Sequence, residues 1–113
     1  MKNKTTAETR AVELLQSILD RAAEAGADMV DLERVPDGLE ILYCSGHTGV
    51  GGLLETPELE APLIDLIVRR ARLHRKAEGT FMWKVHGQNR AIAVEEYDSF
   101  GEACFRLKLG RSS

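Results

Sequence analysis

The chain has 113 residues, of which 43% are hydrophobic and 29% are charged, and its formal net charge at pH 7 is −3. This balance excludes a largely disordered chain and a dedicated polyanion-binding or polycation-binding protein. No window approaches the roughly 18 consecutive apolar residues of a membrane-spanning helix, and the first residues contain no apolar stretch like that of a secretion signal. We therefore expect a cytoplasmic protein. Its length predicts one domain over residues 1–113, with its core at about residues 6–109.

The first predicted element is an amphipathic helix of about five turns. Thr5 and Glu8 have the spacing of a capping box, and Gly26 supplies a stop. Between them, six apolar residues repeat at intervals of three and four: Ala11, Leu14, Leu15, Ile18, Leu19 and Ala22.

A β-hairpin follows, because apolar and polar residues alternate over residues 30–33 and 39–43 around the turn Pro36-Asp37-Gly38. Residues 45–52, SGHTGVGG, raise the question of a phosphate-binding loop. Their spacing matches neither GxGxxG nor GxxxxGK[ST], and the glutamates that follow would repel an anion. We therefore interpret this segment as a flexible turn that crosses to the second helix.

The second helix is predicted to open at Thr56-Pro57 or at Glu60-Ala61-Pro62, and to run to about Ala77, with Gly79 as terminator. Its apolar face is Leu63, Ile64, Ile67, Val68 and Ala71.

The sharpest charge feature is RRARLHRK, residues 69–76, which the prediction places on two turns of this helix. Its cations form a candidate patch for contact with a partner: Arg69, Arg70, Arg72, Arg75 and Lys76. Basic residues at a helix C-terminus also interact favourably with the helix macrodipole. A purely structural role for these cations therefore stays open. Nucleic acid is not an expected partner, since aromatic residues do not interleave with these cations and the total charge is acidic.

The last third alternates again over residues 81–85, 92–94 and 103–109, with turns at Gly87-Gln88-Asn89 and Asp98-Ser99. The order α-β-β-α-β-β-β predicts an α+β fold, in which two helices pack on one face of a five-stranded antiparallel sheet.

Other chemistry-bearing residues are dispersed. The three histidines, His47, His74 and His86, fall in three different segments, which argues against a metal site. Cys44 and Cys104 lie far apart in strand-like segments, and we interpret them as structural thiols. Acidic residues alternate along the first strand and end another, as Asp28, Asp31 and Glu33 and as Glu95-Glu96. They form either an acid–base pair or a solvated outer face, and we favour the solvated face.

Several short stretches follow one another in the order of a known family. These are LLQSILDRAAEAGADMVDLERVPDGLEILYCSG from Leu14, then KAEGTF, then SFGEACFRL. They resemble the "GASDIHIE", "RYRxDG", "PQDGR" and "GExxxxRL" motifs in the amino-terminal region of type II secretion and type IV pilus assembly ATPases, over about residues 12–109. The matching positions are Gly26, Ala27, Glu33, Gly46, Gly79, Gly101, Glu102, Arg106 and Leu107.

The resemblance implies a PAS-like fold, which in the family precedes a RecA-like motor domain with Walker motifs. The motor has no counterpart in these residues, so the expectation is a free-standing module. Most family arginines that help to complete a neighbouring subunit's nucleotide site are also missing. Residues 42–45 (Leu-Tyr-Cys-Ser) stand at the "RYRxDG" segment, and Thr80 replaces the arginine after Gly79.

These observations predict a non-catalytic protein-interaction or regulatory module without cofactor or metal. Its partner would be a protein, either a secretion or pilus ATPase or a second copy of the chain, and neither nucleic acid nor a membrane. One alternative is a PAS-like sensor with a small ligand between sheet and helices, lined by Trp83, Tyr43, Phe105 and Cys44. Another is an enzyme that pairs a cysteine with a histidine, which rests only on their presence.

Overall fold

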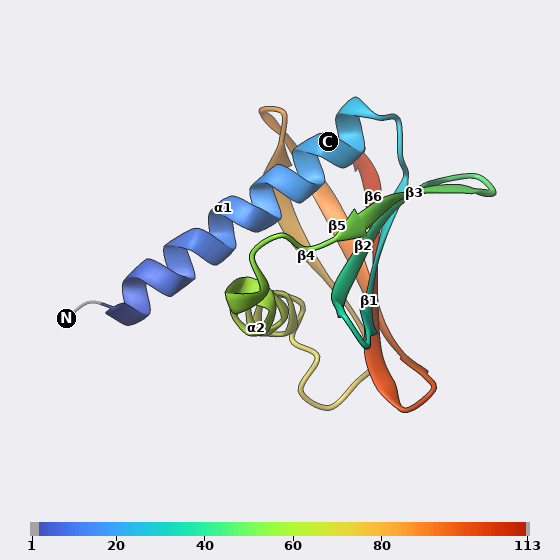
Figure 1. Cartoon of the computed structure of the whole chain (residues 1–113). Coiled ribbons are helices and arrows are strands. Elements are labelled where there is room, and N and C mark those ends of the chain that lie inside the picture. Colours follow the sequence, from blue (N-terminus) through green and yellow to red (C-terminus); the bar gives the residue numbers. More distant parts are fainter. Residues whose placement is uncertain (1–2, 113) are drawn as a thin grey trace.

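The computed structural model describes residues 3–112, with side chains over residues 6–110. The elements are α1 (Asn3–Glu24), β1 (Met29–Val35), β2 (Gly38–Ser45), β3 (Thr48–Leu53), the short 3₁₀ helix η1 (Pro57–Leu59), α2 (Glu60–Ala71), β4 (Glu78–Val85), β5 (Gln88–Ser99) and β6 (Glu102–Ser112). The strands form one six-stranded antiparallel sheet in the order β3-β2-β1-β6-β5-β4. Both α-helices lie on the same face of this sheet (Figure 1). The predicted α+β class with two helices on one face is confirmed, whereas the prediction of five strands was wrong.

The sixth strand is β3, which forms within the glycine-rich segment expected to be a flexible turn. Only Gly46 and His47 make the turn, and the next residues pair with β2 from Ser45↔Thr48 to Glu40↔Leu53. Glycine is poor in strands, but backbone pairing does not need side chains. At Gly51 the side chain must be absent, because a Cβ there would collide with the carbonyl oxygen of Ile41.

Two helix boundaries also differ from the expectation. α1 begins at Asn3, so Thr5 lies inside the helix and is not its cap. α2 ends at Ala71, well before Ala77, because Arg72 takes a left-handed conformation with φ 59°. The amide of Leu73 then donates to the carbonyl of Val68 at 3.0 Å, and Leu73 turns back into the core.

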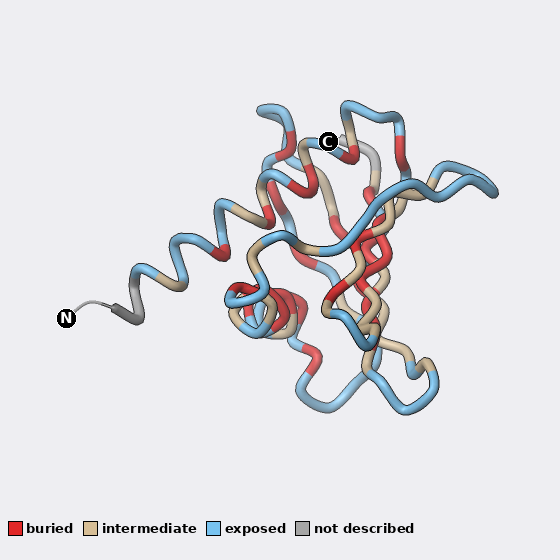
Figure 2. Tube along the Cα trace, in the orientation of Figure 1, coloured by how far each residue is buried: buried red, intermediate tan, exposed pale blue. Residues whose placement is uncertain are grey.

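The core lies between the helices and the sheet. Figure 2 shows the buried residues as a stripe along one side of α1 and as alternate positions of the central strands. Its largest fully buried side chains include Leu15, Leu19, Leu63, Ile67, Phe105 and Leu107. None of the helices within residues 3–112 is long and apolar enough to cross a membrane.

Polar contacts tie α1 to the far side of the sheet. Gln16 Nε2 donates to the carbonyl oxygen of Lys84 at 2.8 Å, and Trp83 Nε1 donates to Gln16 Oε1 at 3.1 Å. The backbone amide of His86 donates to Asp20 Oδ1 at 3.0 Å. The first helix of the chain is thereby fixed to β4, an edge strand that follows it by some 60 residues of sequence.

Candidate functional site

The face of the sheet that points away from α1 and α2, here called the outer face, is the candidate site. Successive side chains of a strand point to opposite faces, and Val30, Leu32, Phe105 and Leu107 belong to the core. Their neighbours therefore point outward: Asp31 and Glu33 from β1, Cys104, Arg106 and Lys108 from β6, and Glu95 and Tyr97 from β5. Neither α-helix of the described chain covers this face (Figure 1).

Arg106 is the centre of the outer face. Its Nε donates to Asp31 Oδ1 at 3.1 Å, and its Nη1 lies 3.6 Å from Glu95 Oε1. Its guanidinium carbon stands 4.8 Å from the centre of the Tyr97 ring, a cation–π distance. The hydrogen bond that Arg106 donates to Asp31 raises the pKa of Arg106, which keeps the cation charged.

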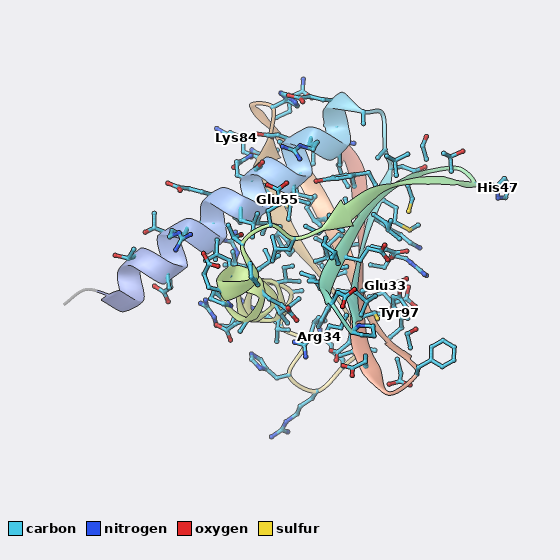
Figure 3. All side chains as sticks on the ribbon, in the orientation of Figure 1. Glu33, Arg34, His47, Glu55, Lys84 and Tyr97 are labelled. Atoms are coloured by element: carbon cyan, nitrogen blue, oxygen red, sulfur yellow. The ribbon has the colours of Figure 1, made fainter. Side chains whose placement is uncertain are left out.

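Tyr97 and Glu33 extend this network toward the β5–β6 turn. The Tyr97 hydroxyl donates to Glu33 Oε2 at 3.2 Å, and Figure 3 shows the two side chains together at one end of the sheet. Burial raises the pKa of the Tyr97 phenol, and the Asp31 and Glu33 carboxylates raise it further. The hydroxyl therefore stays protonated as a donor and does not serve as a general base.

Asp31 corrects the expectation of a solvated carboxylate face. Its exposed fraction is 8%, so it is a buried ion-pair partner of Arg106, whereas Asp28 is exposed. Burying a carboxylate costs free energy unless a nearby cation or hydrogen-bond donors compensate for the lost hydration. Arg106 supplies both, so the pair is built for structure and positioning.

The outer face also places acidic residues directly opposite each other. Glu33 pairs with Glu40 across β1 and β2, and Glu78 pairs with Glu95 across β4 and β5. Like charges in facing positions of neighbouring strands destabilise a sheet. These two acidic pairs flank Arg106 on either side, and we call them the flanking acidic pairs.

The thiols lie on the same face. Cys104 is fully buried and faces Tyr97 across β5 and β6, and Cys44 is partly buried on β2. Burial raises the pKa of the Cys44 thiol, and repulsion from Asp31 raises it further. The surroundings of Cys44 are thus the opposite of those that activate a nucleophilic cysteine.

The basic run at residues 69–76 does not form one helical patch. Arg69 bonds Asp65 Oδ2 through Nε at 2.9 Å, and Arg70 lies over the rings of Phe81 and Trp83 at 5.7 and 5.0 Å. Arg72 caps α2, and Arg75 and Lys76 follow it in the loop, all three exposed. Two of the five candidate cations are therefore engaged within the fold, and contact of Arg72, Arg75 and Lys76 with a partner stays a prediction.

The positions singled out by the resemblance have different roles. Arg106 is central to the outer face, whereas Gly101 occupies the β5–β6 turn with φ 85°, which favours glycine. Glu102 is exposed at the start of β6, where it faces Ser99. Tyr97 was not predicted, although the alternation about Val94 would have put it on the same side as Glu95.

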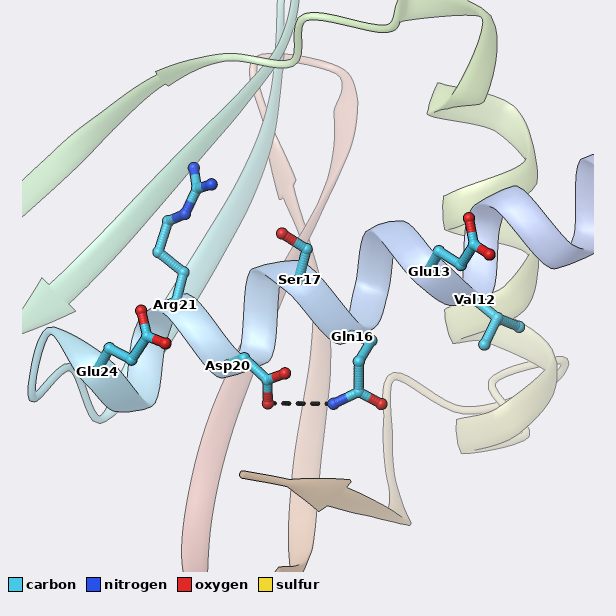
Figure 4. Close-up of a pocket in the computed structure, with 7 residues that line it drawn as sticks. All are labelled: Val12, Glu13, Gln16, Ser17, Asp20, Arg21 and Glu24. Carbon is cyan, nitrogen blue, oxygen red and sulfur yellow. Dashed lines mark hydrogen bonds between the residues drawn. The ribbon is translucent and has the colours of Figure 1, made fainter. Parts of the chain in front are cut away.

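Two hollows lie along α1. One, of 690 Å³, runs over its exposed side, where Gln16 donates to Asp20 within the helix (Figure 4). The other, of 390 Å³, lies between α1 and the β2–β3 hairpin and includes Ile18, Tyr43 and Gly52 in its lining. Of the residues expected to enclose a ligand, only Tyr43 lines this groove, because Trp83 and Phe105 are packed in the core and Cys44 points to the outer face.

The histidines remain apart, in the β2–β3 turn, in the loop after α2 and in the β4–β5 turn. Over the described residues, no group of three or more histidine, cysteine or acidic side chains is arranged to hold a metal ion. Comparison of the sequence with models of known protein families and with curated proteins found no match.

Proposed function

We propose that the chain is a non-catalytic interaction module, a PAS-like relative of the amino-terminal domain of secretion and pilus ATPases, that binds a protein through the outer face. The flanking acidic pairs are the observation that carries this proposal. They oppose like charges on a face that no described helix covers, and the Arg106–Glu95 ion pair and the Tyr97–Glu33 hydrogen bond offset this repulsion only in part.

The expected partner surface is basic. Arg106 already neutralises Asp31 and Glu95 in part, while Glu40 and Glu78 stand outside the ion pairs found among the described residues. Lysine or arginine side chains of a partner would lie against both acidic pairs and relieve their repulsion. Complementary charge of this kind favours fast and selective association. An assembly ATPase of a secretion or pilus system is the partner that the sequence resemblance suggests.

The test is a charge reversal that separates binding from stability. In the variant Glu40→Lys with Glu78→Lys, each like-charge pair becomes an opposite-charge pair, so we expect roughly 0.4–2 kcal/mol of added stability in urea unfolding. Capture of partners from the native host, identified by mass spectrometry, should nevertheless be lost.

The matched control is Glu13→Lys with Glu24→Lys, which makes the same charge change on the exposed side of α1 (Figure 4). This control should capture the same proteins as the unmodified chain. Equal capture by the outer-face variant would refute binding through that face, whatever its effect on stability.

A second candidate function is a small-ligand sensor, favoured by the groove between α1 and the β2–β3 hairpin. Its 390 Å³ falls within the range of small-molecule sites. Burial raises the pKa of Tyr43, and Arg21 lowers it in part, so a protonated phenol beside a cation faces the groove. A screen for ligands that raise the melting temperature of the chain, but not of Tyr43→Ala, tests it.

A further inference from the structure

β3 ends the sheet with an open edge. All six of its residues are exposed, and the tip of the β2–β3 hairpin points away from both helices (Figures 1 and 2). The amide of Leu54 donates to the carbonyl of Leu39 at 2.8 Å. Because bonding alternates along an antiparallel pair, the backbone groups of Gly49, Gly51 and Leu53 point away from β2, toward the open edge.

This edge lacks the usual protection against pairing. Natural edge strands are blunted by charged side chains, proline or a bulge. Residues 48–54 contain neither a charged residue nor a proline, and the pairing of β3 with β2 runs without a register shift. The opposite edge strand, β4, carries Glu78 and Lys84.

We propose that β3 pairs with β3 of a second copy of this chain, antiparallel and centred on Gly51, so that one sheet runs through both subunits. In this register Val50 faces the partner subunit's Gly52, and Leu53 faces the partner subunit's Gly49. Val50 and Leu53 have exposed fractions of 67% and 48%, and the space next to Gly52, where a Cβ would point, is empty. Val50 therefore meets a glycine with open space beside it, and Leu53 meets Gly49, where the nearest atom to a Cβ would be Cys44 Sγ at 3.6 Å.

Just beyond the paired strands, an imidazole and a carboxylate come opposite each other. Continued past β3 into the hairpin turn and the bend that follows the strand, the same register puts Glu55 opposite the partner subunit's His47, once on each side. Both residues are exposed, and Figure 3 shows His47 at the tip of the hairpin. An imidazole that faces a carboxylate donates a hydrogen bond to it when neutral and forms an ion pair when protonated. This self-complementarity favours a second copy over an unrelated extended peptide.

The first test fills the space that pairing needs. Gly52→Val adds a side chain that the monomer accommodates, since nothing lies within 4 Å of that Cβ, but it occupies the place of the partner subunit's Val50. Light scattering over a protein concentration series should show a dimer for the unmodified chain and a monomer for Gly52→Val. Thr80→Val, on the exposed edge strand β4, is the matched control and should remain dimeric.

The second test exchanges the facing charges. His47→Glu places like charges at both ends and should raise the dimer dissociation constant roughly fivefold to tenfold. Adding Glu55→Lys to it should restore dimerisation, because each facing pair is then opposite in charge. A role of His47 within its own hairpin turn would not be rescued in this way.

Hydrogen exchange supplies the local readout. The amides of Gly49, Gly51 and Leu53 should exchange more slowly in the dimer than in Gly52→Val. A chain that stays monomeric up to about 1 mM, or a dimer that neither Gly52→Val nor His47→Glu weakens, would overturn the proposal. Slow exchange that requires added host proteins would assign the edge to another protein instead. Outer-face binding is independent of these outcomes, because it uses a different surface.

Discussion

At the scale of single residues, the two thiols lie in surroundings that suppress reactivity. The raised pKa of Cys44 leaves a smaller thiolate fraction at any given pH than an exposed thiol has, and Cys104 is fully buried. We therefore expect iodoacetamide to label Cys44 more slowly than free cysteine at pH 8, with the labelling rate rising only at higher pH, and to label Cys104 only after unfolding. Cys44→Ser assigns the labelled site. Labelling of Cys44 faster than free cysteine at pH 7 would reveal an activated thiol and would support the alternative of an enzyme with a catalytic cysteine.

Arg106 shows how far single residues could be interpreted from the sequence. It was singled out because it matches a short motif of the family that the sequence resembles. The alternation of β6 then puts its side chain on the face of the sheet away from the core. Its partner Asp31 lies 75 positions away in the sequence. Their contact depends on β1 and β6 being neighbours in the sheet, and strand order does not follow from local patterns.

At the scale of elements, the close approach of β4 to the end of α2 requires a glycine. Gly79 was expected to terminate the helix, but it lies in β4, where a Cβ would collide with the carbonyl oxygen of Ala71 and stand 3.2 Å from the Ala71 Cβ. Gly79→Ala should therefore lower the free energy of unfolding by roughly 1–3 kcal/mol, measured in urea. Gly52→Ala, whose Cβ meets nothing within 4 Å, is the control and should change it little at protein concentrations low enough for the chain to be monomeric. Equal stability of the two variants would mean that helix and strand separate freely.

The elements that were predicted correctly had strong periodicity, and those that were missed had competing signals. The apolar stripe of α1 and the alternation of β1, β2, β4 and β6 specified their type. β3 was missed because its glycines favour a turn, although pairing with β2 decides its conformation. The end of α2 was misplaced because Arg72 has no local stop signal, and burial of Leu73 drives the chain out of the helix there.

At the scale of the molecule, the pairing of β1 with β6 is the seam that joins two halves of the sheet. Strands β1 to β3 form one half and β4 to β6 the other, and no other strands pair across them in residues 3–112. On the core side, apolar side chains of the helices and strands pack over the seam. Gln16 of α1 also contacts the second half of the sheet, because its side chain donates to the carbonyl oxygen of Lys84 in β4. On the outer face, Asp31 and Arg106 are paired residues of the seam.

This position makes the ion pair a test of how the halves hold together. Arg106→Leu leaves the Asp31 carboxylate buried without its cation, which should lower the free energy of unfolding by roughly 1–3 kcal/mol, less than for a fully enclosed pair because the Arg106 side chain is 33% exposed. Asp31→Val together with Arg106→Leu should recover most of that loss, since apolar side chains on adjacent strands replace the pair. Urea unfolding followed by Trp83 fluorescence in β4 and by far-ultraviolet circular dichroism should give one coincident transition for all three proteins, because α1 bridges both halves. Separate transitions in Arg106→Leu would show that cooperative unfolding of the sheet depends on the seam more than on the contact of α1 with both halves. An unchanged free energy of unfolding would show that the Asp31–Arg106 pair contributes nothing to stability.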